Sequence, residues 1–191
     1  MPPKIRVSKE QVLSTAFEMT REDGFEALTA RKLAERLNSS TQPIFRTYEN
    51  MDSLKEDLFY KCEEFYRDRM ENSVNEFEPA YLSMSLKYIE LAQSEYHLFS
   101  LLSAVSIHEN DDTGIYLQNG DLKKVFKGLP DEKRLNEDQK TDLLKLLWIF
   151  THGLASMIAG KRLIVENEGV SDMLKRAYEG FLNAETGDKS G

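Results

Sequence analysis

The stretch TARKLAERLNSSTQPIFRTY, residues 29–48, decides how the N-terminal part of this chain folds. Two segments with helical apolar spacing lie on either side of a short polar turn. Thr29 is a good N-cap for the first segment, and Ala34 is small where two helices must cross closely. Asn38 stands at the turn, which needs a left-handed backbone that asparagine tolerates well. With Ile44 as an apolar plug on the second segment, the stretch predicts a helix-turn-helix.

The second helix of this motif carries the side chains that would read DNA bases. A recognition helix presents its N-terminal residues to base edges in the major groove. Gln42 can pair bidentately with adenine and Arg46 with guanine, and each such contact discriminates by about 1–3 kcal/mol. Thr41 and Phe45 can touch a thymine methyl group, and Ser40 lies beside them at the start of the helix.

Five further side chains are candidates for contacts with the phosphate backbone. Thr29 opens the first helix of the motif, where backbone N–H groups attract anions, and Arg31 follows it. Lys4, Arg6 and Lys9 precede or open the first helix of the chain and can follow a phosphate strand or enter a minor groove. Such contacts position a protein on duplex DNA without specifying the sequence.

A longer match surrounds this motif. It comprises Ala16-Phe17, Gly24-Phe25, LTARKLAERL at 28–37 and IFRTYENMDSL at 44–54. In these residues, segment 8–58 resembles the N-terminal domain of the TetR family of transcriptional regulators. The resemblance implies operator binding, and it places six residues where family members touch DNA: Thr29, Arg31, Thr41, Gln42, Phe45 and Arg46.

Two positions depart from the family pattern. Phe45 stands where the family usually has a tyrosine whose hydroxyl often reaches a phosphate, and Met51 stands where it usually has a lysine. Both of those phosphate contacts are therefore missing here. Lys55, one helical turn beyond Met51, is the expected substitute.

Helical spacing of apolar residues continues through nearly the whole chain, and no alternating strand pattern interrupts it. The predicted fold class is therefore all-α, with about nine helices, of which three form a helix-turn-helix head. The expected boundaries are Ser8 to Gly24, Thr29 to Leu37, Ser40 to Tyr48, Asn50 to the polar joint at Asn72–Glu78, Pro79 to Ser94, His97 to Leu102, Tyr116 to Phe126, Asn136 to Asn167, and a last helix from Ser171. Gly169 is the expected stop of the eighth helix. Capping pairs are expected at Ser8 with Gln11 and at Asn136 with Gln139, and single caps at Asn50 and Ser171.

These helices divide into three expected parts. Residues 1–50 form a DNA-binding head, residues 51–185 form a C-terminal ligand-binding and dimerisation body, and residues 186–191 form a flexible tail. The long fourth helix joins the head to the body without a flexible linker.

The eighth and ninth helices carry much apolar surface. Two copies of this helix pair can form a four-helix interface with two-fold symmetry, and the other interpretation is a pair buried in its own core. The expected interface residues are Leu154, Met157, Ile158, Leu174, Tyr178 and Phe181. A homodimer would present two recognition helices about 34–36 Å apart to a pseudo-palindromic operator in double-stranded DNA.

The body also has many aromatic and methionine side chains on the predicted inner faces of its helices, and core packing explains most of them. Trp148 to Gly153 resembles the WHG-type C-terminal domain of part of the TetR family, in which the body usually encloses a pocket. The resemblance implies a small, mainly hydrophobic effector. The candidate pocket residues are Phe65, Tyr66, Met70, Met84, Tyr88, Phe99, Tyr116, Trp148, Thr151 and His152. Of these, Tyr88, Thr151 and His152 would supply polar groups.

Charge is distributed unevenly along the chain, whose net charge is −8. Residues 1–60 contain nine Lys or Arg and ten Asp or Glu, while the remainder contains sixteen and twenty-three. The acidity therefore lies mainly in the body. A DNA-binding protein needs only a suitable local surface, so this balance does not exclude one.

Other classes of protein find little support in the sequence. The single cysteine, Cys62, supports neither a disulfide framework nor a zinc site, and the three histidines are too far apart for a metal triad. The chain opens without a signal-peptide core, and the apolar stretch Leu143–Gly160 is too short and mixed for a membrane span. Motifs of phosphate-binding loops and hydrolases are missing. We therefore expect a cytoplasmic protein that is not an enzyme and has no cofactor, metal or membrane partner.

The expected function is a transcriptional regulator, with repression and ligand-induced release from the operator as the family's usual mode. The ligand would favour a body conformation in which the fourth helix swings and changes the distance between the two heads. The alternative is a protein of this fold that binds a ligand or partner but no operator. A continuous positive strip through Arg6, Arg31, Arg46 and Lys55 would favour DNA binding, and a neutral strip would favour the alternative.

Overall fold

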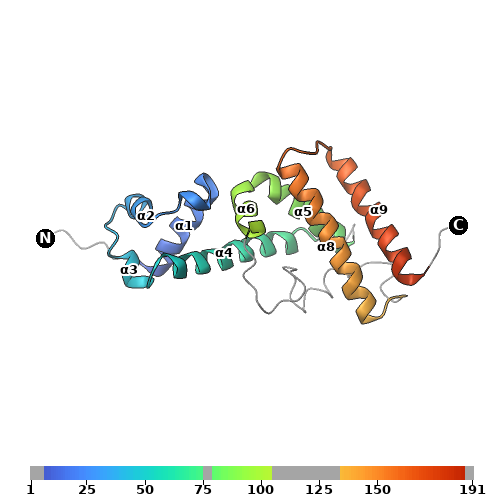
Figure 1. Ribbon diagram of the computed structural model, residues 1–191, viewed down its shortest axis with the longest axis horizontal. Helices are drawn as coiled ribbons and strands as arrows, with labels where there is room; N and C mark the ends of the chain where they lie inside the picture. Colours follow the sequence, from blue (N-terminus) through green and yellow to red (C-terminus); the bar gives the residue numbers. More distant parts are fainter. Residues whose placement is uncertain (1–6, 75–78, 105–133, 188–191) are drawn as a thin grey trace. The chain divides into compact units, whose positions relative to one another are not determined.

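The computed structural model describes residues 7–74, 79–104 and 134–187, and over these ranges the chain is helical without a strand (Figure 1). The predicted all-α class is confirmed. The helices are α1 (Lys9–Asp23), the 3-10 helix η1 (Phe25–Ala27), α2 (Ala30–Arg36), α3 (Ile44–Thr47), α4 (Met51–Glu71), α5 (Ala80–Ser94), α6 (Tyr96–Ala104), α8 (Glu137–Ala159) and α9 (Asn167–Thr186). The predicted seventh helix, with Tyr116, lies outside the described residues, as do Lys4 and Arg6.

Two capping boxes begin helices α1 and α8 as predicted. Gln11 donates its backbone N–H to Ser8 Oγ at 3.1 Å, and the Ser8 N–H donates to Gln11 Oε1 at 2.9 Å. Asn136 and Gln139 repeat this reciprocal pair at 2.9 and 3.0 Å. Each box satisfies N–H groups that a helix start leaves without an intrahelical acceptor.

Three further local predictions in the N-terminal part are confirmed. The Thr29 hydroxyl caps α2 by accepting from the Lys32 N–H at 3.3 Å. Asn50 Oδ1 caps α4 by accepting from two backbone N–H groups at 2.9 Å each. Asn38 has a φ of 50°, the left-handed conformation that the turn between α2 and α3 requires.

The recognition helix is shorter than predicted. It begins at Ile44 rather than near Ser40, and residues 41–43 form a turn in front of it. Pro43 stands immediately before the helix with a φ of −60° and a ψ of −35°, and a proline has no N–H to donate. The Thr41 carbonyl still accepts from the Ile44 and Phe45 N–H groups at 3.1 and 3.3 Å, so this turn leads directly into α3.

The predicted boundary between the last two helices was wrong. Helix α8 ends at Ala159, because Lys161 turns into the left-handed region at a φ of 55°. The Arg162 N–H then donates to the Met157 carbonyl at 2.8 Å and the Lys161 N–H to the Ile158 carbonyl at 2.9 Å. This is a Schellman stop, which usually places a glycine at the left-handed position.

Helix α9 consequently begins earlier than predicted, at Asn167. Gly169 and Ser171, the expected stop and the expected cap, lie inside it. At its other end α9 includes Thr186, which the prediction had assigned to the tail, and Gly187 ends the helix with a φ of 73°.

The chain forms two compact units whose boundaries differ from the predicted division at residue 50. The head unit comprises Met1–Phe65 with Glu95–Val105, and the body unit comprises Tyr66–Ser94 with Ser106–Gly191. The head unit therefore takes in most of α4 as well as α6. Helix α4 passes from one unit into the other without a break.

Each unit has its own apolar core. In the head unit, α1 packs against α2, α3 and α6. Its fully buried side chains include Val12, Leu33, Ile44, Leu54 and Leu58. In the body unit, α8 packs against both α5 and α9, and Leu143, Leu147 and Leu174 are fully or almost fully buried. Burying each of these large side chains contributes roughly 1.5–3 kcal/mol.

Among the described residues, α8 alone is long and apolar enough to cross a membrane by length and composition. Its packing is that of a core helix, because one of its faces is buried against α5 and α9 within the body unit.

Candidate functional site

The helix-turn-helix of the head unit buries one face and exposes the other. Leu33 and Ala34 of α2 and Ile44 of α3 are buried, and they hold the two helices in place. The predicted base-reading side chains lie on the exposed side. Ser40, Gln42, Phe45 and Arg46 are exposed and Thr41 is half-buried. Phe45 leaves 47% of its surface open, so its ring is available for contact with a partner.

Of the predicted phosphate-binding residues, Thr29 and Arg31 are exposed and Lys55 is half-buried, and all three already have polar partners. Thr29 is exposed at the N-terminus of α2 and caps that helix. Arg31 forms an ion pair with Glu35 at 3.1 Å. The Lys55 ammonium group lies 3.3 Å from Asp52 and 5.6 Å from the centre of the Phe25 ring.

Pairing with carboxylates extends to most cations of this region. Five of the seven Lys and Arg residues described between positions 7 and 60 have a carboxylate within 4.0 Å. Within the described part of the chain, Lys32 and Arg46 have no such partner. The strip anticipated through Arg31, Arg46 and Lys55 is thus interrupted by negative charge, and Arg46 is its unpaired cation.

Lys9 is committed to structure and is a poor candidate for DNA. Its ammonium group lies 2.7 Å from Asp57 of α4 and 4.9 Å from the centre of the Tyr48 ring. The hydrogen bond from Lys9 lowers the pKa of Asp57, while burial raises the pKa of Tyr48. This contact fixes the start of α1 against α4.

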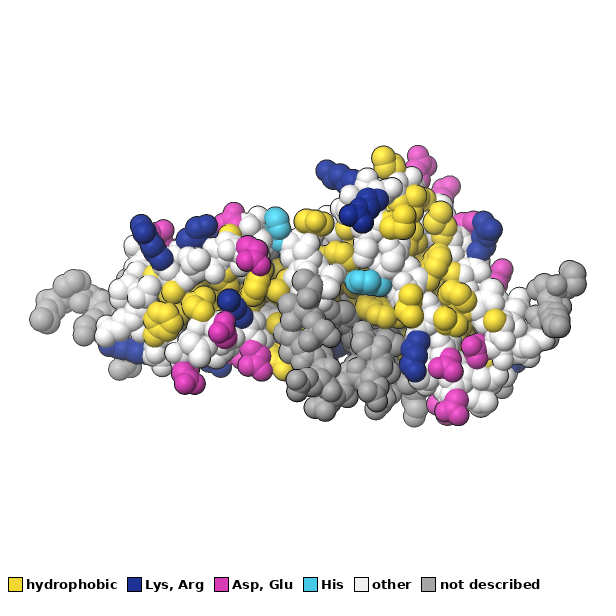
Figure 2. All heavy atoms as spheres, viewed as in Figure 1, with side chains coloured by type: hydrophobic (Ala, Val, Ile, Leu, Met, Phe, Trp, Pro, Cys, Tyr) yellow, Lys and Arg dark blue, Asp and Glu magenta, His cyan; other side chains and the backbone are white. Residues whose placement is uncertain are grey.

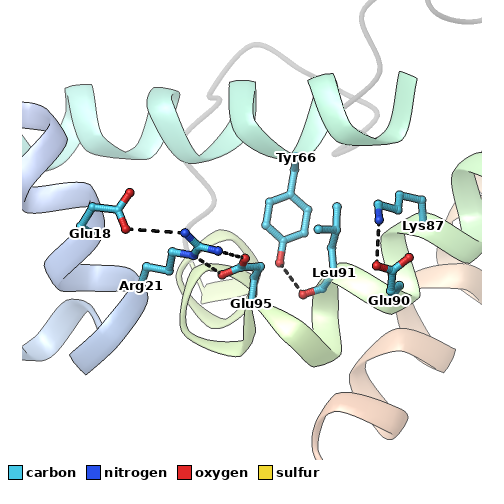
Figure 3. Close-up of polar contacts among 7 residues, drawn as sticks. All are labelled: Glu18, Arg21, Tyr66, Lys87, Glu90, Leu91 and Glu95. Carbon is cyan, nitrogen blue, oxygen red and sulfur yellow. Dashed lines mark hydrogen bonds and ion pairs between the residues drawn. The ribbon is translucent and has the colours of Figure 1, made fainter. Parts of the chain in front are cut away.

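Sequence reasoning missed a second contact that fixes the other end of α1. Arg21 donates to both carboxylate oxygens of Glu95, at 2.6 Å from Nε and 2.5 Å from Nη2, and Glu18 lies 3.6 Å from the same guanidinium group (Figure 3). Glu95 is buried, and the hydrogen bonds between the two side chains raise the pKa of Arg21. The residues are 74 positions apart, so no local pattern points to the pair.

Gly24 strengthens this second contact. It combines a φ of 86° with close packing, since a Cβ atom built there would lie 3.1 Å from Nδ1 of His97. Helix α6 therefore docks on the C-terminal end of α1 through two adjacent points, which we call the α1–α6 latch: Arg21 with Glu95, and Gly24 with His97.

The body unit contains a mainly apolar pocket, and it gathers half of the predicted ligand-binding residues. Its lining consists of Met70, Tyr81, Met84, Ser85, Tyr88, Leu144, Leu147, Trp148 and Thr151. Tyr81, Ser85, Leu144 and Leu147 were missed. A signal for them existed, because they lie three or four residues from predicted members on the same faces of α5 and α8.

Other predicted pocket residues lie elsewhere. Phe65 belongs to the head unit, where its ring packs 5.3 Å from that of Phe17, and Phe99 is buried in α6 of the same unit. Tyr66 is buried in the body unit and donates its hydroxyl to the Leu91 carbonyl at 3.2 Å (Figure 3). These three side chains do not line the pocket.

Tyr88 is the centre of a polar and aromatic cluster beside the pocket. Its hydroxyl lies 2.9 Å from Nδ1 of His152, and its ring centre lies 4.9 Å from that of Trp148. Burial lowers the pKa of His152, which favours the neutral imidazole. A neutral Nδ1 without a proton would accept the Tyr88 hydroxyl proton, so His152 acts as a hydrogen-bonded packing residue next to the site.

The predicted dimer residues divide by burial. Leu154, Ile158 and Leu174 are buried inside their own unit, so they do not present a free surface. On α8 the exposed apolar side chains are Ile149 and Met157, 67% and 46% open. The other two predicted residues lie on α9, where Tyr178 stacks on Tyr81 and Phe181 packs 6.3 Å from Phe150. Figure 2 shows apolar side chains gathered over the part of the surface that α8 and α9 form.

Cys62 and the acidic residues offer no further chemistry in the described ranges. Burial raises the pKa of the Cys62 thiol to about 12, which disfavours the reactive thiolate. Over residues 7–74, 79–104 and 134–187, no three His, Cys, Asp or Glu side chains are grouped so as to hold a metal ion.

Comparison with known proteins gives a consistent fold. No family model and no curated protein matches the sequence. Among solved structures, a TetR family protein from Vibrio parahaemolyticus superimposes with a TM-score of 0.63 at 18% identity, covering 90% of this chain and 96% of that one. A TetR-family transcriptional regulator from Haemophilus influenzae gives 0.63 at 19% identity, covering 89% and 93%. A TetR-like transcriptional regulator from Rhodococcus sp. RHA1 gives 0.57 at 12% identity, covering 95% and 98%.

Proposed function

The chain has the fold of TetR-family transcriptional regulators over most of its length, and from this premise we propose that it is a DNA-binding transcriptional regulator. The observation that carries the proposal is the exposed row Gln42, Phe45 and Arg46, held in place by the buried Leu33 and Ile44. An amide, an aromatic ring and an unpaired guanidinium group on one surface are suited to base edges and thymine methyl groups. The regulator would act in the cytoplasm, where the DNA is.

Charge pairing in the head unit determines the kind of DNA binding we propose. Affinity that comes from phosphate neutralisation falls steeply with salt, by about 0.9 logarithmic units per phosphate contact. Since Arg31 and Lys55 are already paired with carboxylates, few such contacts are available. We therefore expect recognition to depend on base contacts, with a shallow dependence on salt.

A homodimer supplies the second half-site. We propose that Ile149, Met157 and the neighbouring Phe150 and Phe181 form the interface, because they leave apolar surface on α8 and α9 that the chain itself does not cover. Leu154, Ile158 and Leu174 would support this surface from within. Two-fold pairing would place two α3 helices on one face of a pseudo-palindromic duplex.

Regulation by a ligand follows from helix α4. Its Met70 lines the pocket of the body unit, and the same helix continues into the head unit as far as Met51. A ligand that prefers one position of Met70 would shift the population of α4 conformations and thereby of operator-competent dimers. Release of a repressor by a small, mainly hydrophobic effector is the form of regulation we propose.

Selection of bound duplexes from a random-sequence DNA pool tests the proposal. We expect enrichment of a pseudo-palindrome with two half-sites. On the selected duplex, Gln42→Ala or Arg46→Ala should weaken binding by about 10- to 100-fold, which corresponds to about 1–3 kcal/mol. Arg176→Ala is the matched control, because it removes an exposed arginine of α9 that is paired with Asp172. Absence of any enriched sequence would contradict the proposal.

A second function is favoured by one specific observation, the pairing of most head cations with carboxylates. A head whose cations are paired with carboxylates has few cations available for phosphate contacts. Such a head favours a protein that binds a ligand or a partner but no operator. Under this alternative the DNA pool yields no enrichment, while the chain still dimerises and binds a ligand.

A further inference from the structure

The pocket of the body unit has a mainly apolar and aromatic lining. Three aromatic rings, two methionines and two leucines surround it, and no charged side chain is among the described residues that line it. We propose that this pocket binds an uncharged, flat aromatic molecule with at most one hydrogen-bonding group. The inference deepens the proposed function, on which it rests for the role of that molecule as the effector.

Most polar groups of the lining are already used. Tyr81 donates its hydroxyl to the Leu174 carbonyl at 2.8 Å, and the Tyr88 hydroxyl is bonded to His152 at 2.9 Å. What remains is one buried pair of hydroxyls, in which Thr151 Oγ1 donates to Ser85 Oγ at 3.3 Å. Ser85 keeps one hydroxyl proton, so this pair can serve a single polar group of a ligand.

A charged ligand would lose its hydration in this pocket and gain no counter-charge. Burying an unpaired carboxylate or ammonium group costs far more than burying a neutral hydroxyl that finds one partner. Aromatic faces attract cations, but the described lining contains no carboxylate that could balance a positive charge, and burial favours the neutral form of His152 beside it. The lining therefore selects uncharged molecules.

Ring geometry favours an aromatic ligand over an aliphatic one. The Tyr88 and Trp148 rings lie 4.9 Å apart at 52°, and Tyr66 adds an edge contact to Tyr88 at 6.0 Å. Aromatic rings associate in such tilted and edge-to-face arrangements, so a further ring would extend the cluster on its pocket side.

Space for a ring must come from the two methionines. The cavity volume is about 40 Å³, enough for roughly three water molecules. A benzene ring occupies an engineered cavity of about 150 Å³. Met70 and Met84 are unbranched and polarisable, so they can turn aside and then pack on the ring. Since Met70 belongs to α4, ring binding would act on the helix shared by both units.

Trp148 provides the measurement. It is the single tryptophan of the chain and it lines the pocket, so its fluorescence reports occupancy directly. The full chain is titrated with four ring compounds of similar size: toluene, phenol, benzoate and benzylammonium. We expect a saturable change of Trp148 emission with toluene and phenol, tighter binding of phenol, and no change with either ion.

Three variants sharpen the test. Met84→Ala enlarges the pocket and should strengthen binding of both neutral compounds by about tenfold. Met19→Ala is the matched control, because Met19 is equally buried but lies in α1 of the head unit. Thr151→Val combined with Ser85→Ala removes both hydroxyls of the Thr151–Ser85 pair and should abolish the preference for phenol over toluene.

Two results would overturn the inference. One is a response to benzoate or benzylammonium as strong as that to phenol, and the other is no response to the neutral compounds in the unaltered chain and in Met70→Ala and Met84→Ala alike. If the chain binds phenol but enriches no DNA sequence, the inference about the pocket stands and the proposed regulator function is contradicted. If the chain enriches a palindrome but binds none of these ring compounds, only the inference about the pocket is contradicted.

Discussion

The head unit and the body unit treat charge in opposite ways. In the head unit, cations such as Arg31 and Lys55 lie on the surface and carry a carboxylate beside them. In the body unit, the pocket has no charged side chain among its described lining residues, and its hydroxyls are paired with one another, with backbone or with His152. Of the Lys and Arg residues that the structure describes between positions 7 and 60, only Lys32 and Arg46 are without a carboxylate partner. The comparison teaches that recognition at each surface depends mainly on shape and short-range contacts, including that of Arg46 in the head, because few unpaired charges are available for long-range attraction.

The ion pair of the α1–α6 latch differs from the exposed ion pairs of the head unit, because its carboxylate, Glu95, is buried. Arg21→Ala would leave Glu95 without its bidentate partner in a site that water reaches poorly. We expect the free energy of unfolding in urea to fall by about 2–3 kcal/mol, the largest effect among these predictions. Arg36→Ala, which breaks an exposed pair with Glu22, should leave the unfolding midpoint unchanged. Equal midpoints for the two variants would show that the buried pair is not special.

Removing the carboxylates that pair with head cations should make DNA binding by the head tighter and more dependent on salt. Glu35→Gln and Asp52→Asn would release Arg31 and Lys55 from their ion pairs. On the selected duplex we expect affinity to rise by about tenfold for the double variant and the slope of log K against log salt to steepen by about one unit per released cation. Glu90→Gln breaks a similar exposed pair with Lys87 in the body unit and is the control (Figure 3). An unaltered slope would remove both cations from the interface.

The smallest expected effect belongs to His152 in the body unit. Burial lowers its pKa below the ordinary value of about 6.5, so the unfolded chain takes up the proton at a higher pH than the folded chain does. The contribution to stability is therefore complete above about pH 6.5 and is lost as the pH falls from there towards the lowered pKa, by at most about 1.4 kcal/mol per pH unit.

Unfolding measured between pH 7.5 and 5 tests this dependence, at pH values on both sides of about 6.5. In His152→Gln, the free energy of unfolding should fall less as the pH is lowered. Tyr88→Phe keeps the imidazole, so its free energy of unfolding should fall with pH as in the unaltered chain. A loss of stability of the same size in His152→Gln would assign it to other groups.

Local chemistry made much of the head predictable. The caps at Ser8, Thr29 and Asn50 and the left-handed Asn38 each depend on residues within a few positions, so their sequence signals were sufficient. The start of the recognition helix was less predictable, because the helix begins at Ile44 although the polar residues typical of such a start begin at Ser40.

The rest depended on contacts between distant segments or on unusual backbone. Nothing near Arg21 in the sequence points to Glu95, and a lysine rather than a glycine takes the left-handed position after α8. The pocket-lining residues of α5 and α8 could be predicted from helical spacing once one lining residue on each helix was known. The burial of Leu154, Ile158 and Leu174 could not be predicted in this way. Periodicity shows that a helix face is apolar, but it does not show whether that face is covered by the same chain or by a second copy.

The latch has a consequence for the order in which the protein is made. A ribosome releases α1 to α4 long before α6, so Arg21 emerges well ahead of the carboxylate that completes its site. The nascent head is completed only when residues 95–104 have emerged from the ribosome, and α5 of the body, which precedes them in the chain, has emerged by then. A nascent chain stalled after α4 should therefore be digested readily by protease, and one stalled beyond α6 should resist.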